Sequence, residues 1–226
     1  MLYGKKAIVL GARGGLGVEV VNALTKEGRI NTVMELDLPD FDVTDSACRA
    51  EFRLKHEHDT WDVIINCAGI NRPRSIKDMY TNHIIDHMDA NILGFVEFIR
   101  GSLPKISKDG VICNVVSTAA TWPMTNSLAY CMSKAAQLQA TKVMARELKR
   151  THGVTVFSVS PHVLNTPMTT RVYEDLPKPL SPGAQEELER LIQPEALAEL
   201  IAFIVTRPTQ YRNLNGCDIP YGAPRQ

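Results

Sequence analysis

The sequence has no long apolar run. Its apolar stretches are short, and none approaches the ~20 residues that a membrane-spanning helix needs. The first stretch, within residues 1–15, is broken at once by glycine and arginine, so it lacks the apolar length and the cleavage site of a secretion signal. We therefore expect a soluble cytoplasmic protein that makes no use of a membrane.

An excess of charge is also absent. The chain of 226 residues carries 25 Lys and Arg against 25 Asp and Glu, so its formal net charge is zero. No global attraction to nucleic acid or to an anionic lipid surface follows from such a balance. We expect neither nucleic acid nor membrane as a partner.

Cysteine is scarce, and no two cysteines form a C-x-x-C pair. The count of five is odd, which is typical of reduced thiols rather than of a disulfide framework or a zinc site. His83 and His87 lie four positions apart in an expected helix, but no carboxylate or cysteine set accompanies them. We expect both on a solvated helix surface, and no metal site.

The sequence does contain an alternation of short β-branched runs and longer helical patterns. Several runs are apolar at every position, as expected of strands covered by helices on both faces. The alternation predicts an α/β fold, a Rossmann-type doubly wound parallel sheet of about seven strands in a single domain, 1–226. The expected strands are 5–11, 32–37, 41–43, 61–69, 110–117, 153–161 and 216–220, and the expected helices are 15–27, 44–58, 80–101, 127–151 and 194–206.

The region 166–193 departs from this rhythm, because its first part holds Pro167, Pro177, Pro179 and Pro182. A mobile excursion at the carboxyl edge of a sheet is a candidate substrate lid. A plain surface loop is the equal alternative.

A glycine loop follows the first expected strand, with Gly11, Gly15 and Gly17 in the pattern G-x-x-x-G-x-G. Glycines there let backbone N–H groups approach a pyrophosphate, and the following helix presents its positive end to that anion. A tight turn would use the same glycines. The position between a strand and a helix favours a dinucleotide site.

Two residues bear on which dinucleotide is bound. Asp37 closes the second expected strand, where a carboxylate binds ribose hydroxyls and repels the 2′-phosphate of NADP; Glu35 is the alternative if the strand register differs. Arg13 lies inside the glycine loop and could pair with that phosphate instead. The balance leans towards NAD over NADP.

A short connection separates Asp37 from Asp42 by four residues. Asp42 could hydrogen-bond an adenine amino group, with Val43 against the ring, or could begin a turn that Thr44 or Asp45 caps into a helix. Both roles are compatible.

Tyr130 and Lys134 lie four positions apart in an expected helix and so share one face of it. An ordinary tyrosine has a pKa near ~10, and a neighbouring ammonium would lower it. The spacing alone is common, so the pair needs the rest of a site around it.

The order of these features resembles the short-chain dehydrogenases/reductases in their single-domain form, over nearly the whole chain. The marks are the glycine loop, "DV" at 42–43, "NCAG" at 66–69, Asn91, Ser117, Y-x-x-x-K at 130–134 and "SPHVLNTPM" at 160–168. Each mark is weak alone, and their shared order makes the resemblance specific. The step of 13 residues from Ser117 to Tyr130 also matches that family.

The resemblance implies a catalytic set. Tyr130 would be the general acid in reduction and the general base in oxidation, supported by Lys134. Ser117 would hydrogen-bond the substrate oxygen. Asn91 would kink its helix and bind a water that links Lys134 to solvent.

The resemblance also implies an NAD or NADP site. "NCAG" would line the adenosine ribose, and the residues after the sixth expected strand would hold the nicotinamide. The implied cofactor residues are Gly11, Arg13, Gly15, Leu16, Gly17, Asp37, Asp42, Val43, Asn66, Ala68, Gly69, Tyr130, Lys134, Pro161, Val163 and Thr166.

The implied function is an NAD(P)-dependent oxidoreductase that interconverts a secondary alcohol and a ketone on a small-molecule substrate, as a homodimer or homotetramer. The short 37–42 connection also fits a reductase of a nucleotide-linked sugar, and a non-catalytic dinucleotide-binding redox sensor is a third hypothesis. His162 stands where the family has glycine, and we expect it to face solvent.

Overall fold

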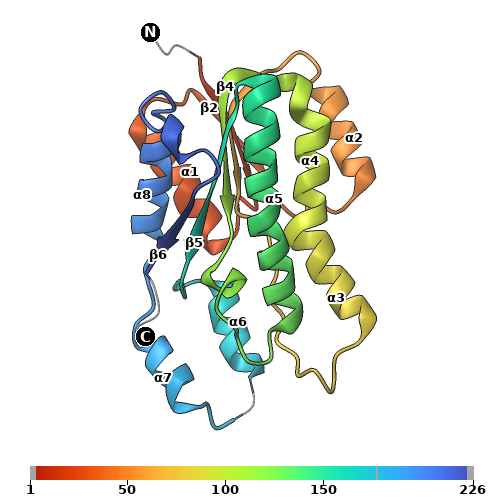
Figure 1. Cartoon of the computed structure of the whole chain (residues 1–226), viewed down its shortest axis with the longest axis vertical. Coiled ribbons are helices and arrows are strands. Elements are labelled where there is room, and N and C mark those ends of the chain that lie inside the picture. Colours follow the sequence, from red (N-terminus) through yellow and green to blue (C-terminus); the bar gives the residue numbers. More distant parts are fainter. Residues whose placement is uncertain (1–3, 177, 223–226) are drawn as a thin grey trace.

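The computed structural model describes residues 4–176 and 178–222. Its centre is a parallel sheet of six strands in the order β2-β1-β3-β4-β5-β6. The arrowheads of the strands point towards α6 and α7 (Figure 1). The strands are β1 Lys6–Leu10, β2 Thr32–Leu36, β3 Trp61–Asn66, β4 Ile106–Val115, β5 Thr155–Pro161 and β6 Asp218–Tyr221.

Helices cover both faces of the sheet, as predicted. Helices α1 and α8 pack on one face, and α2, α4 and α5 lie on the other (Figure 1). The helices are α1 Gly15–Glu27, α2 Ser46–Lys55, α3 Thr81–Met88, α4 Gly94–Ser102, α5 Leu128–His152, α6 Pro167–Asp175, α7 Pro182–Leu188 and α8 Pro194–Val205. In the described ranges, no helix is both long and apolar enough to cross a bilayer.

The central strands β1, β3 and β5 are buried on both faces, which explains the apolar runs in their sequence. Ile8 and Val9 are adjacent in β1 and point to opposite faces, yet both are fully buried. The two faces form separate apolar clusters, one under α1 and α8 and one under α2, α4 and α5. The prediction of a doubly wound parallel sheet is thus confirmed.

One of the seven expected strands is not formed. Residues 41–43 make no strand, and the chain turns there from β2 into α2. Phe41 is buried and packs edge-on against Phe52 and Phe98, at ring-centre distances of 5.8 and 5.9 Å. This aromatic anchor places the segment beneath the helical layer, away from the edge of the sheet.

The helix expected over 80–101 is interrupted. A π-helical segment, Asp89–Leu93, separates α3 from α4, and Asn91 is at its centre. The extra residue of a π turn marks functional positions in many helices. The break agrees with the expectation that Asn91 kinks its helix.

The proline-rich region 166–193 contains two helices, α6 and α7, and is not a plain loop. Prolines begin both helices, where the missing N–H is not needed. Pro177 lies outside the described residues. The end of the region returns to the sheet, because Ile192 exchanges hydrogen bonds with Val163 and Asn165.

Candidate active site

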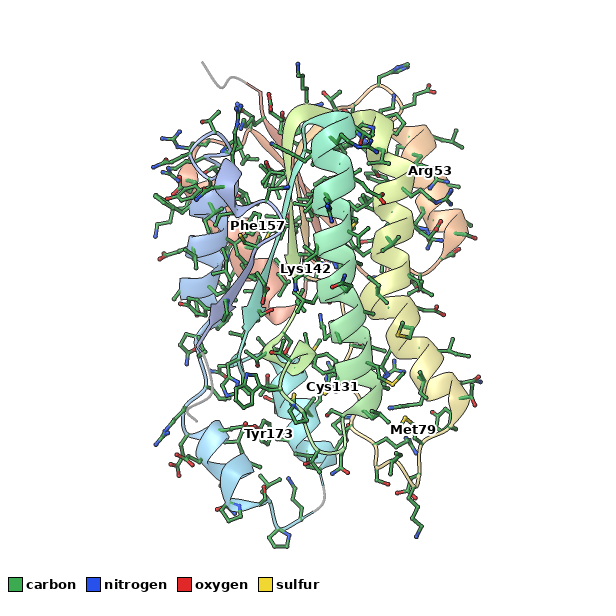
Figure 2. All side chains as sticks on the ribbon, viewed as in Figure 1. Arg53, Met79, Cys131, Lys142, Phe157 and Tyr173 are labelled. Carbon is green, nitrogen blue, oxygen red and sulfur yellow. The ribbon has the colours of Figure 1, made fainter. Side chains whose placement is uncertain are left out.

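Parallel strands bring their carboxyl ends to one edge of the sheet, and most of the expected site residues follow those ends. Cys131, beside Tyr130 on α5, and Tyr173 on α6 lie at this same end of the molecule (Figure 2). The residues that meet at this edge are Gly11 after β1, Asp37 after β2, Asn66 at the end of β3, Ser117 after β4 and Pro161 at the end of β5.

The glycine loop is packed too tightly for side chains. A Cβ added to Gly17 would lie 2.0 Å from the Gly11 carbonyl oxygen, and one added to Gly11 would lie 2.6 Å from the Ala68 nitrogen. A Cβ on Gly15 would meet Thr166 at 2.8 Å. The glycines therefore bring the α1 turn against both the "NCAG" turn and the start of α6.

The start of α1 suits an anion. Gly14 is the N-cap and carries no side chain, and the first turn holds no acidic residue. Leu16 and Gly17 are buried behind this turn, which leaves backbone N–H groups as its donors. The donor set and the close backbone approach both fit a dinucleotide pyrophosphate.

Asp37 is held by the glycine loop itself. Its carboxylate accepts hydrogen bonds from the Arg13 N–H at 2.7 Å and the Leu38 N–H at 2.8 Å. Glu35, the alternative acid, lies inside β2 opposite Val9 and not at the strand end.

The Arg13 side chain turns towards the short connection after β2. Its guanidinium donates to the Leu38 carbonyl at 2.9 Å and pairs with Asp40 at 2.5 Å. Asp40 was not among the expected site residues. Its only sequence signal is its place three residues after Asp37.

Asp42 stabilises the turn in which it lies. Its carboxylate accepts hydrogen bonds from both the N–H and the hydroxyl of Thr44, each at 2.8 Å, and Asp45 caps α2. The Val43 carbonyl accepts from Arg49 at 2.6 Å. The capping alternative is confirmed, while a contact of Asp42 or Val43 with adenine stays a prediction.

The Tyr130 and Lys134 side chains meet on the first turns of α5, with the Lys134 Nζ 5.7 Å from the centre of the Tyr130 ring. The Ser117 hydroxyl is close enough to the Tyr130 hydroxyl to favour the phenolate and so to lower the pKa of Tyr130. Burial outweighs this effect and raises the pKa of Tyr130 to about 12.

Lys134 is desolvated together with Tyr130. Burial lowers the pKa of Lys134 to about 7, so the amine is close to half neutral at neutral pH. The expectation that Lys134 lowers the pKa of Tyr130 stays a prediction.

Asn91 is fully buried and closes the turn after "NCAG". Its amide oxygen accepts from the Ile70 N–H at 2.7 Å, and its amide nitrogen donates to the Ile70 carbonyl and to Ser133. Gly69 lies beside both Asn91 and Lys134, since a Cβ there would lie 3.0 Å from the Asn91 amide oxygen and 3.6 Å from the Lys134 Nζ. The water relay through Asn91 stays a prediction.

The segment after β5 is bound to the end of region 166–193. The Val163 carbonyl accepts a hydrogen bond from the Ile192 N–H at 3.0 Å, and the contact of Val163 with a nicotinamide stays a prediction. Thr166 is the N-cap of α6 and lies against Gly15. Pro161 is buried at the end of β5.

Three histidines differ from expectation. His162 is not fully solvated, since its side chain is 22% exposed and lies 3.3 Å from the Thr118 hydroxyl. His83 and His87 are buried on α3, and His87 accepts a hydrogen bond from the Arg72 N–H. The loop after β3 folds over α3 and covers the face that the sequence pattern assigns to solvent.

Sequence reasoning missed a group of buried polar residues behind the site, namely Asn114, Ser133, Gln137 and Thr141. Asn114 lies next to Asn66 in neighbouring strands and accepts a hydrogen bond from it at 2.9 Å. Asn114 inside an apolar strand is the signal that could have found this group, because an amide there needs buried partners.

Comparison with known proteins places the chain in a family. The family model described as Enoyl-(Acyl carrier protein) reductase matches residues 6–217. An uncharacterized oxidoreductase of Staphylococcus haemolyticus is 27% identical over 229 residues, which cover 92% of this chain and 93% of the relative.

Solved structures share the fold. A short chain dehydrogenase family protein of Francisella tularensis has a TM-score of 0.84 at 22% identity, covering 96% of each chain. The 3-ketoacyl-(acyl-carrier-protein) reductase of Brucella melitensis, complexed with NADH, has a TM-score of 0.77 at 21% identity, covering 97% of each chain. With the family match across nearly its whole length, the chain belongs to the short-chain dehydrogenases/reductases and is an oxidoreductase of that family.

Proposed function

We propose that the protein is an NAD(P)-dependent oxidoreductase that interconverts a secondary alcohol and a ketone. The observation that carries the proposal is the meeting of Tyr130, Ser117 and Lys134 behind an anion-binding glycine loop. The NADH bound to the Brucella relative supports a dinucleotide at the same edge of the sheet. The nicotinamide, when bound, supplies the hydride chemistry.

Tyr130 exchanges the proton of the reacting oxygen. With its pKa raised to about 12, Tyr130 keeps its hydrogen at neutral pH and is ready to donate it to a carbonyl oxygen. The Ser117 hydroxyl touches Tyr130 and orients the same oxygen. In alcohol oxidation the same group takes up the proton as the phenolate.

Lys134 holds the ribose next to the nicotinamide. Its Nζ donates to the Val115 carbonyl at 3.1 Å and to Gln137 at 2.9 Å, which leaves one hydrogen of the ammonium for a third acceptor. Gly69 lies beside the Lys134 Nζ, and because it has no side chain it leaves the space there free for that acceptor.

The preferred cofactor is NAD. Asp37 is fixed at the end of β2 where ribose hydroxyls bind, and it would face a 2′-phosphate with like charge. Arg13, the cation that would bind such a phosphate, is paired with Asp40. The carboxylates of Asp37 and Asp40 therefore both favour NAD over NADP.

Three further assignments belong to this proposal. Region 166–193 is a substrate lid, with α6 and α7 lying beyond the carboxyl ends of the strands (Figure 1). The chain is a single domain that works in the cytoplasm. It assembles as a homodimer or homotetramer.

The test is a fluorescence titration of the purified chain with NADH and with NADPH. We expect both to bind, with NADH tighter. A chain that binds neither contradicts the proposed function. A screen of small ketones and alcohols with the preferred cofactor then identifies the substrate.

A further inference from the structure

Four fully buried polar side chains form one hydrogen-bonded group behind the catalytic lysine. Asn66 and Asn114 come from neighbouring strands, and Gln137 and Thr141 come from successive turns of α5. A buried amide without partners is strongly destabilising, so its bonds determine how it is oriented.

The orientation of each amide in this group follows from the hydrogen bonds of Thr141. The Thr141 hydroxyl donates to the backbone carbonyl of Gln137, so it must accept from the Asn114 amide nitrogen, at 2.9 Å. The Asn114 oxygen then faces Asn66 at 2.9 Å and the Gln137 amide nitrogen at 2.7 Å. The Gln137 oxygen is left to face the Lys134 Nζ, at 2.9 Å.

The surroundings of Lys134 give this oxygen particular weight. The titratable groups that face its amine are Cys67, after β3, and Tyr130 on α5. Burial raises the pKa of the Cys67 thiol to about 12, so both are neutral at neutral pH. Among the described residues, Lys134 forms no ion pair.

The ammonium form of Lys134 therefore depends on two dipoles, the Val115 carbonyl and the Gln137 side chain. The backbone carbonyl is fixed by β4 and is present whatever the sequence. The Gln137 oxygen is the part of this support that the side chains provide, and Asn114 and Thr141 determine its direction.

We propose that Gln137 is a positioning residue for Lys134: its side-chain oxygen stabilises the ammonium form of the amine and points it at the cofactor edge. Asn114 connects Gln137 to Asn66, whose oxygen also accepts from the Ala68 N–H in the "NCAG" turn. The same group thus holds the lysine and the turn behind the glycine loop in one register. The catalytic value of this arrangement rests on the proposed function.

The experiment measures the titration of Lys134 directly. The chain is labelled with ¹³C at lysine Cε, the Lys134 signal is assigned by its absence in Lys134→Met, and its shift is followed against pH without cofactor. The variants are Gln137→Met, which is apolar and of similar length, and Gln137→Asn, whose amide falls one methylene short. The matched control is Gln139→Met, on the exposed side of the same helix.

The direction of the change separates the two explanations. Loss of an acceptor from a buried ammonium should lower the pKa of Lys134 by about one pH unit in both Gln137 variants. A role in packing alone would loosen the helix, admit water and raise the pKa towards its usual value. The Gln139 control should match the native chain.

A pKa that is unchanged or raised in the Gln137 variants overturns the proposal. If Gln137→Met does not fold, as judged by thermal unfolding, Gln137→Asn alone decides. The titration uses no cofactor, so a native chain that binds neither NADH nor NADPH would contradict the proposed function and leave this result readable.

Discussion

The Lys134 Nζ lies 5.7 Å from the centre of the Tyr130 ring and donates its hydrogen bonds to the Val115 carbonyl and to Gln137. The two residues are neighbours on one helical face, but the hydrogen bonds of the Lys134 Nζ go to groups other than Tyr130. The polar side chain that acts on the Tyr130 hydroxyl is Ser117. Proton transfer and charge support are thus divided between two sets of contacts.

Replacing Tyr130 by phenylalanine removes the proton donor and keeps the ring. We expect the turnover of an identified ketone to fall by about 10²–10⁴-fold, with the dissociation constant of NADH changed by less than about threefold. Initial rates and a fluorescence titration measure the two quantities. Tyr211→Phe, far from the site on the loop before β6, is the matched control, and turnover that survives in Tyr130→Phe would show that another group moves the proton.

The NADH affinity should depend on pH through Lys134. The pKa of about 7 in the free chain rises when the ammonium gains an acceptor on the cofactor, so binding is strongest below pH 7 and weakens as the pH rises through that value. Titrations between about pH 5 and about pH 9, roughly two pH units on each side of that pKa, measure this slope. In Lys134→Met the affinity should be lower and nearly independent of pH, and a native chain without any slope would contradict the assignment.

Replacing Asp40 by asparagine should alter cofactor preference without touching Asp37. The change releases Arg13 from its ion pair and removes one negative charge, so NADPH should bind about threefold to tenfold tighter while NADH changes little. Competitive titrations with the two cofactors give the ratio. Asp40→Asn combined with Arg13→Ala should lose the gain, and a gain that persists would mean that Arg13 is not the receptor for the phosphate.

Gly17→Ala tests the packing of the loop. The new methyl would lie 2.0 Å from the Gly11 carbonyl oxygen, so the loop must shift away from its anion-binding shape. We expect NADH binding to weaken at least about tenfold and thermal stability to fall, since an overpacked site costs about 1–3 kcal/mol. Gly183→Ala on α7 meets nothing within 4 Å and should leave both properties close to native.

The sequence predicted what depends on regular alternation. The apolar strands and the glycine loop are local patterns, so the parallel sheet with helices on both faces was predictable. The assignments of Ser117 and Tyr130 came from the order and spacing of motifs that resemble the family. The expected strand at 41–43 failed because Phe41 is captured by Phe52 and Phe98, residues distant in the sequence.

Other features also depend on contacts between distant segments. The burial of His83 and His87 requires the loop after β3 to fold over α3, which no helical periodicity reveals. The hydrogen bond from Lys134 to Gln137 depends on the orientation of the Asn114 amide, which lies in β4 and not in α5. The pKa of Lys134 is set by burial, which residue types alone do not determine.

All six strands run in one direction, so the molecule has two unequal rims. The glycine loop, Ser117 and Tyr130 lie at the rim of the carboxyl ends, whereas the opposite rim includes short connections such as residues 28–31, 56–60 and 153–154. An affinity tag, a surface-immobilisation handle or a fused reporter inserted at 56–60 would therefore stand a full strand length from the cofactor edge. The amino-end rim is therefore the preferred position for such an insertion in a substrate screen.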